Sequence, residues 1–144
     1  MDYGELAFEL IKGMKALHKI KTHRSINDAL QGEAFVLDCI ALGDGDVLPG
    51  EIGQEMNVSS ARVAAALNSL EKKGLITRRI DTNDRRKILI GITPEGKKLA
   101  ETHQSAVLGL AAKMLELLGD PDATEYVRIM KKLTTLLPEY KEQT

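Results

Sequence analysis

The sequence predicts a mainly α-helical protein that carries one small β-hairpin. Aromatic residues make up only 3% of the 144-residue chain, and Trp is absent, so the core must be built from aliphatic side chains, which favours helices over a β-sandwich. Apolar residues recur at helical spacing near both ends of the chain. Between these ends, residues 76–92 alternate in steps of two, as two short strands do.

Length and composition fit a single soluble domain. A hydrophobic fraction of 43% with 28% charged residues argues against disorder, and no apolar run reaches the ~18 residues of a membrane span. The N-terminal residues lack the apolar segment of a signal peptide. The single cysteine, Cys39, has no disulfide partner in the chain. We therefore expect a cytoplasmic protein without a membrane partner.

Long helices are predicted at both ends of the chain. Apolar residues at steps of three and four mark a first helix from Tyr3 to Ile20. Thr93-Pro94 and Asp120-Pro121 each place a capping residue before a proline, which predicts two further helix starts with Thr93 and Asp120 as the N-caps. Terminal apolar stripes are difficult to bury in one small domain, so we expect a homodimer. The alternative is a monomeric bundle.

The middle of the chain predicts a helix-turn-helix. A short helix spans Gly32–Leu42 and is followed by a turn at residues 43–46. A helix from Leu48 to Met56, a break at Asn57 and a second helix capped by Ser59 come next. Gly74 ends this second helix in the left-handed conformation.

A hairpin follows the helix-turn-helix directly. Isoleucines at positions 76, 80, 88, 90 and 92 and the arginine at 78 mark two alternating strands around a polar tip. Together these elements form a winged helix-turn-helix in residues 32–93, within one structural domain overall. Residues 1–31 and 94–144 would supply a helical dimerisation region.

Positive charge gathers in the same region. Residues 58–98 hold ten Lys/Arg against four Asp/Glu, whereas the rest of the chain holds ten against seventeen. A basic region within an acidic protein is the electrostatic pattern of a nucleic-acid-binding surface. The alternative interpretation is a solvated charged face.

The second helix of the motif separates into two faces. Val63, Ala66, Leu67 and Leu70 share one side and are expected in the core. The opposite side is small and polar enough to enter a major groove, where amide and guanidinium groups reach base edges. The predicted DNA-binding residues of this helix are Ser59, Ser60, Arg62, Ala65, Asn68 and Ser69.

The hairpin supplies a second set of cations. Its predicted DNA-binding residues are Arg78, Arg85, Arg86 and Lys87, which can reach phosphates or a narrow minor groove beside the helix. Asp81 and Asp84 are expected to have a structural role, capping the loop or holding an arginine.

These motifs, taken in order, resemble the multiple antibiotic resistance regulator (MarR) family of bacterial winged-helix repressors. The most specific match is the run Leu70-Glu71-Lys72-Lys73-Gly74-Leu75-Ile76, then Arg78-Arg79, Asp84-Arg85-Arg86 and Thr93-Pro94-Glu95-Gly96. The resemblance implies a homodimeric repressor on a pseudo-palindromic operator, released by a small lipophilic or aromatic ligand or by cysteine oxidation. The family often has Thr and Arg where this chain has Ala64 and Ala65, so more of the base contact would fall to the neighbouring residues.

Other side chains have less specific interpretations. We expect a ligand pocket near Met14, His18, Phe35 and Cys39, with Cys39 as a buried structural thiol rather than a reactive one. The three histidines lack metal-ligand spacing, and no catalytic motif is present, so we expect no metal, no cofactor and no enzyme activity. The alternative function is an interaction module whose basic face contacts protein or RNA.

Overall fold

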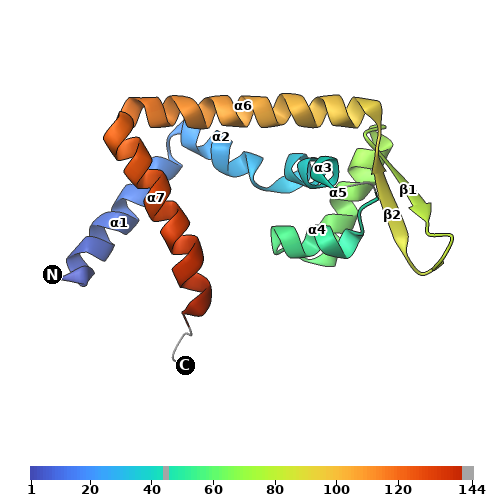
Figure 1. Cartoon of the computed structure of the whole chain (residues 1–144), viewed down its shortest axis with the longest axis horizontal. Coiled ribbons are helices and arrows are strands. Elements are labelled where there is room, and N and C mark those ends of the chain that lie inside the picture. The colour runs from blue at the N-terminus through green and yellow to red at the C-terminus, as the bar shows by residue number, and fades with distance from the viewer. Residues whose placement is uncertain (44–45, 141–144) are drawn as a thin grey trace. The chain divides into compact units, whose positions relative to one another are not determined.

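The computed structural model describes residues 1–43 and 46–140, so part of the turn predicted at residues 43–46 lies outside the described residues. The chain forms two compact units, residues 1–107 and 108–144. The elements run in the order α1 (Tyr3–His18), α2 (Lys21–Ala29), α3 (Gly32–Leu42), α4 (Pro49–Met56), α5 (Ser60–Lys72), β1 (Ile76–Ile80), β2 (Ile88–Ile92), α6 (Pro94–Leu118), α7 (Asp120–Leu136) and the 3-10 turn η1 (Leu137–Glu139) (Figure 1). The predicted helical fold with a two-stranded hairpin is confirmed.

Helix α5 begins and ends where its capping residues predict. Ser59 is its N-cap, and Gly74 follows with a φ of 74°, a conformation that glycine adopts without steric cost. Before α5, Asn57 has a φ of 52°, which turns the chain between α4 and α5. The helix-turn-helix predicted from the sequence is therefore present as α4 and α5.

The hairpin is tied to the helices at its base. Strands β1 and β2 pair antiparallel with Ile76 opposite Ile92 and Ile80 opposite Ile88. Val47, which precedes α4, adds an isolated antiparallel bridge to Ile90. Ile76 and Ile90 are buried, whereas Ile80 and Ile88 are exposed nearer the tip, so only the base of the hairpin belongs to the core.

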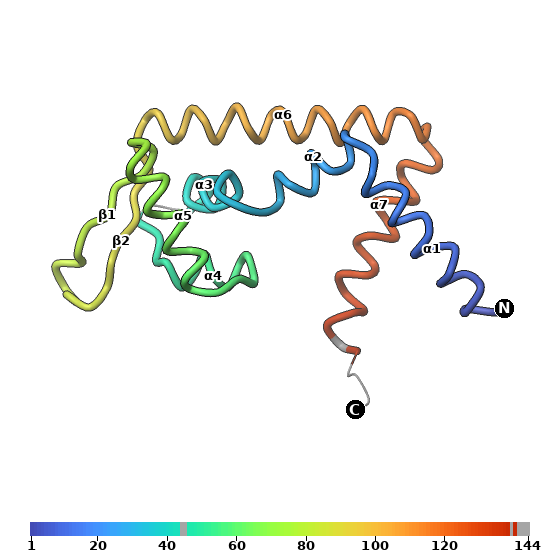
Figure 2. Tube along the Cα trace, turned by 180° about the vertical axis from the view of Figure 1, so that it is seen from behind, coloured from blue at the N-terminus to red at the C-terminus, as the bar shows by residue number. Residues whose placement is uncertain are grey.

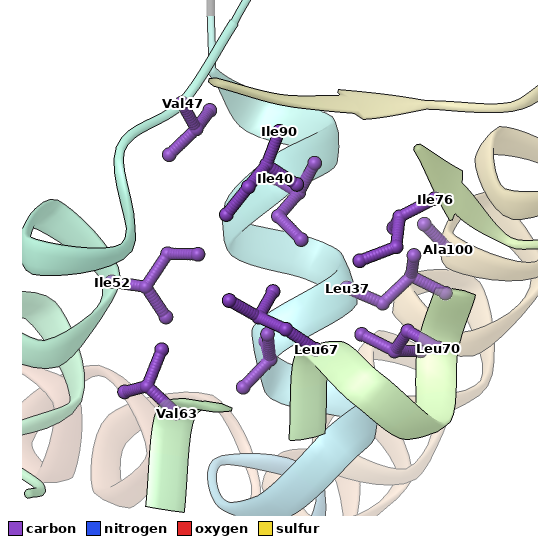
Figure 3. Close-up of a cluster of buried hydrophobic side chains, with 11 residues drawn as sticks. Leu37, Ile40, Val47, Ile52, Val63, Leu67, Leu70, Ile76, Ile90 and Ala100 are labelled. Carbon is purple, nitrogen blue, oxygen red and sulfur yellow. The ribbon is translucent and has the colours of Figure 1, made fainter. Parts of the chain in front are cut away.

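A single aliphatic cluster holds the first unit together (Figure 3). Each element from α3 to α6, together with the segment before α4, contributes to it. Its buried members are Val36, Leu37, Ile40, Val47, Ile52, Val63, Leu67, Leu70, Ile76, Ile90 and Ala100. Burial of apolar surface contributes roughly 25 cal/mol per Å² to the free energy of folding. This cluster is therefore the main source of stability of the winged helix-turn-helix.

Two predictions about element starts need correction. Asp120 is the first residue of α7 and not its N-cap, which is Gly119 with a φ of 80°. Residues with a Cβ rarely adopt this conformation, so the glycine is the residue that separates α6 from α7. Helix α2 was not predicted, because its sequence KTHRSINDA is polar and its N-cap, Ile20, makes no side-chain capping bond. The first helix accordingly ends at His18 rather than Ile20.

Helices α1 and α7 contain no buried residue. Their large apolar side chains, including Leu6 and Leu10 of α1 and Met130 and Leu133 of α7, remain exposed. No helix within residues 1–43 and 46–140 is both long and apolar enough to cross a membrane.

Candidate nucleic-acid interface

The exposed face of α5 is the centre of the predicted interface. Ser59 Oγ accepts a hydrogen bond from the backbone N–H of Arg62 at 3.3 Å, which fixes the start of the helix. The remaining N–H groups of the first turn have no partner within the helix and suit an anion such as phosphate. Val63, Leu67 and Leu70 are buried, so the opposite side of α5 faces outward as predicted.

Five of the six predicted residues at this helix are exposed. They are Ser59, Ser60, Arg62, Ala65 and Asn68. The sixth, Ser69, is half-buried, and its hydroxyl donates to Glu33 Oε1 at 3.0 Å. Ser69 is therefore held toward α3, away from the outer face.

Glu33 links α3 to the C-terminal half of α5. Besides Ser69, the carboxylate accepts a hydrogen bond from Lys73 Nζ at 2.9 Å. The Lys73 ammonium lowers the pKa of the Glu33 carboxyl, and the Ser69 hydroxyl lowers it further. Sequence reasoning missed this contact because the partners lie 36 and 40 residues apart.

The loop between β1 and β2 forms the hairpin tip (Figure 2), and its own aspartates hold it. Asp81 accepts from the backbone N–H of Asn83 at 2.9 Å. Asp84 accepts from both the backbone N–H and the Nε of Arg86, each at 3.1 Å. The Arg86 guanidinium lowers the pKa of the Asp84 carboxyl. The structural role expected of both aspartates is confirmed.

Arg78 connects the hairpin to the end of α5. Its Nε and Nη2 donate to the two carboxylate oxygens of Glu71 at 3.2 and 3.0 Å. The hydrogen bonds from Arg78 lower the pKa of the Glu71 carboxyl, and Glu71 in turn raises the pKa of Arg78. Because this bidentate pair already satisfies much of the guanidinium, Arg78 acts first as a brace between β1 and α5.

Two of the predicted wing cations form no ion pair in the described part of the chain. Arg85 and Lys87 are exposed, and within residues 1–43 and 46–140 neither forms an ion pair. Arg79, on the same hairpin, pairs with Asp46. The four cations predicted to contact DNA therefore divide into two braced arginines, Arg78 and Arg86, and two free cations.

The hairpin and the start of α5 border one groove. Its volume is about 500 Å³, and Ser60, Ala64, Arg78 and Ile88 lie along its walls. The outer face of α5 and the side of the hairpin thus open onto the same surface. The groove is lined by small residues of α5 and by Arg78, and a helix with small exposed residues can enter the major groove of duplex DNA.

The residues predicted for a ligand pocket are spread over two helices. Met14 and His18 are exposed on α1, whereas Phe35 and Cys39 are half-buried on α3. Burial raises the pKa of the Cys39 thiol, and the negative charges of Glu55 and Asp38 raise it further. A protonated thiol is a poor nucleophile, which agrees with a structural cysteine.

One histidine, His103, contacts a carboxylate on another helix. His103 Nδ1 lies 2.8 Å from Asp38 Oδ2, which joins α6 to α3. In the part of the chain that the structure describes, no three His, Cys, Asp or Glu side chains gather in a way that could hold a metal ion.

Comparison with known proteins agrees with this geometry. The model of the MarR family matches residues 26–87, which cover α3, α4, α5 and β1 and end just before β2. The winged helix-turn-helix of this chain is similar to that of the MarR family. The relatives that match most of the chain are named as transcriptional regulators.

Relatives and solved structures extend the likeness beyond the matched residues. The HTH-type transcriptional repressor YetL of Bacillus subtilis is 25% identical over 140 residues, which span 96% of this chain and 84% of that protein. A putative transcriptional regulatory protein for the hcr operon of Thauera aromatica is 27% identical over 135 residues, covering 90% of this chain and 79% of that one. The fold is similar to that of Streptococcus pneumoniae FabT in complex with DNA, with a TM-score of 0.71, 22% identity and coverage of 97% and 100% of the two chains.

Proposed function

We propose that this chain is a MarR-family regulator that represses transcription by binding a pseudo-palindromic operator in duplex DNA as a homodimer. The observation that carries the proposal is the exposure of Arg62 and Asn68 on the outer side of α5, which borders a groove together with the strands of the hairpin, while Arg85 is exposed at the hairpin tip. Two relatives support it: YetL is named a repressor, and FabT was solved with DNA.

The proposal assigns different tasks to the helix and the hairpin. Arg62 and Asn68 would read base edges in the major groove, where a bidentate contact is worth ~1–3 kcal/mol of discrimination. Arg85 and Lys87 would contact phosphates or the flanking minor groove, which contributes to affinity for any sequence. Arg86 would contribute less to affinity than Arg85 because Asp84 already holds its guanidinium.

Binding isotherms at several salt concentrations test these tasks. The probes are duplex DNA from upstream of the protein's own gene and a scrambled duplex of the same composition. Arg62→Ala should lose more affinity on the upstream duplex than on the scrambled one. Arg85→Ala should weaken both equally and reduce the slope of log affinity against log salt by about 0.9, and Arg86→Ala should reduce it less.

Arg24→Ala is the matched control, because Arg24 is an exposed arginine on α2. It should leave both the affinity and the salt slope unchanged. If the wild-type protein binds neither duplex, the basic face serves a protein or RNA partner instead and the repressor proposal fails.

The homodimer and release by a small lipophilic or aromatic ligand belong to the same proposal. The exposed apolar faces of α1 and α7 support the dimer, since neither helix buries a residue by itself. The pocket of Met14, His18, Phe35 and Cys39 stays a prediction, and it would need a surface that covers the exposed side chains of α1.

A further inference from the structure

The centre of the outer side of α5 is formed by methyl groups. A helix turns by about 100° per residue, which places Ala61, Ala65 and Asn68 next to one another, and all three are exposed. They lie opposite Val63 and Leu70, which are buried in the core. The side chains of α5 that a base pair would meet first are therefore two alanines and one asparagine.

An alanine side chain can distinguish bases in only one way. It has no donor or acceptor, so it cannot read a base edge by a hydrogen bond. Of the four base edges in the major groove, only that of thymine carries a methyl group. Removing two methyl groups from water together is favourable, and a short side chain lets the helix backbone come close to the base pairs. Thymine is therefore the base that Ala61 and Ala65 can recognise.

The spacing of these residues matches a short run of A·T base pairs. Ala61 and Ala65 are separated by about 6 Å along the helix axis, which is less than two base-pair steps of about 3.4 Å each. For a helix that lies along the groove, both alanines reach thymines within about three consecutive base pairs. Asn68 lies beside them, and its amide suits the N6 and N7 positions of adenine.

We propose that Ala61 and Ala65 determine specificity by contacting the C5 methyl groups of thymines, so that each half-site has a run of A·T pairs at its centre. The inference rests on the proposed function, because it assigns a base to a surface that is itself proposed to bind an operator. Arg62, whose guanidinium suits guanine, would read a base pair at the edge of the run. The cations of the hairpin do not contribute to this discrimination, since phosphate contacts carry no sequence information.

Replacing thymine by uracil in the DNA tests the contact, because uracil lacks the C5 methyl group but pairs with adenine in the same way. The probes are the same upstream and scrambled duplexes, each prepared with thymine and with uracil. Wild type should bind the uracil form of the upstream duplex at least about fourfold less tightly, the effect of burying one methyl group. The two forms of the scrambled duplex should bind alike, because phosphate contacts dominate non-specific binding.

Glycine variants locate the contact on α5. The double variant Ala61→Gly with Ala65→Gly removes both methyl groups, so its affinities for the thymine and uracil forms of the upstream duplex should become nearly equal. The single variant Ala65→Gly should give an intermediate ratio. Partial unfolding does not change this ratio, because a loss of folded protein lowers both apparent affinities by the same factor. Ala106→Gly, at an exposed position on α6, is the matched control and should keep the wild-type ratio.

The outcomes separate this inference from the operator proposal. Equal binding of the two upstream duplexes by wild type would overturn the thymine contact and leave the operator proposal standing. A double variant that kept the wild-type ratio would also overturn it, because the methyl groups of the DNA would then be sensed elsewhere. If wild type bound no form of the upstream duplex, the proposed function would fail, and this inference with it.

Discussion

Ion pairs determine how much of the basic region is available to a polyanion. Lys73, Arg78, Arg79 and Arg86 each contact a carboxylate, so the charge count from the sequence overstates the local positive field. Their role is to fix geometry: they brace α5 against α3 and β1 and hold the hairpin tip. The side chains proposed to contact DNA are the exposed ones that remain, chiefly Arg62, Arg85 and Lys87.

Glu33 should make stability depend on pH in the acid range. Its carboxyl pKa is lowered by Lys73, so its contribution is complete above the ordinary glutamate pKa of about 4.3 and is lost as pH falls through the folded-state value. Glu33→Gln should lower the free energy of unfolding at pH 7 by about 0.5–1.5 kcal/mol. The difference from wild type should shrink below about pH 4.

Urea unfolding at pH 7 and in the acid range measures this difference. Glu101→Gln, at an exposed position on α6, is the matched control and should change stability little at pH 7. If the difference in free energy of unfolding between Glu33→Gln and wild type stayed the same at acid pH, the charge of Glu33 would contribute nothing to stability.

Side-chain contacts between residues close in the sequence were easier to predict than contacts between residues far apart in it. The roles of Asp81 and Asp84 follow from turn chemistry, because each bonds a group two residues away. The contacts of Ser69 with Glu33 and of His103 with Asp38 join residues 36 and 65 positions apart. Such pairs depend on how helices pack, which periodicity does not specify, so the sequence alone does not predict the contact of Ser69 with Glu33.

At the scale of elements, strong local signals gave the right boundaries. Ser59 and Gly74 delimit α5, and Thr93 caps α6 by accepting from the backbone N–H of Gly96 at 3.1 Å. Helix α2 lacked such signals. Its formation depends on tertiary packing, in which Ala29 is buried, and this context overrides a weak intrinsic preference.

The junction between the hairpin and α6 depends on a glycine. A Cβ at Gly96 would lie 2.0 Å from the carbonyl oxygen of Leu75, so the backbone would have to move. Gly96→Ala should destabilise the protein by about 1–3 kcal/mol, the typical cost of overpacking. Gly109→Ala, in the same helix but with nothing within 4 Å of the added Cβ, should stabilise by about 0.5–1 kcal/mol.

Chemical denaturation of both variants provides the comparison. Because both changes replace glycine by alanine in α6, their difference isolates the contact with Leu75 from helix propensity. If Gly96→Ala proved as stable as Gly109→Ala, α6 could not pack against Leu75 as closely as the structure indicates.

At the scale of the whole molecule, the apolar faces of α1 and α7 require a partner surface. Tyr126, Met130 and Leu133 fall on one side of α7 at helical spacing, and all are exposed. Exposed apolar faces of this extent mark interaction sites in soluble proteins. The homodimer proposed above would supply that surface through a second copy of the chain.

Sedimentation of α7 variants tests the dimer. Wild type should sediment at about twice the chain mass of 15.8 kDa at micromolar concentration. Leu133→Glu introduces a charge into the apolar side of α7 and should shift the protein toward monomer. Thr135→Glu introduces the same charge on the opposite side of the helix and should leave the dimer intact. A wild-type monomer with intact folding would contradict the homodimer.

The hairpin tip is built from contacts among its own residues. Asp81 and Asp84 bond Asn83 and Arg86, and backbone hydrogen bonds join Lys87 to both aspartates, while the core begins only at the base of the strands. Substitutions of the side chains of Thr82 and Asn83, between the two aspartates, should therefore cost little folding free energy. The side chains of the tip can therefore change while the winged helix-turn-helix keeps its stability, which leaves what this loop recognises free to vary.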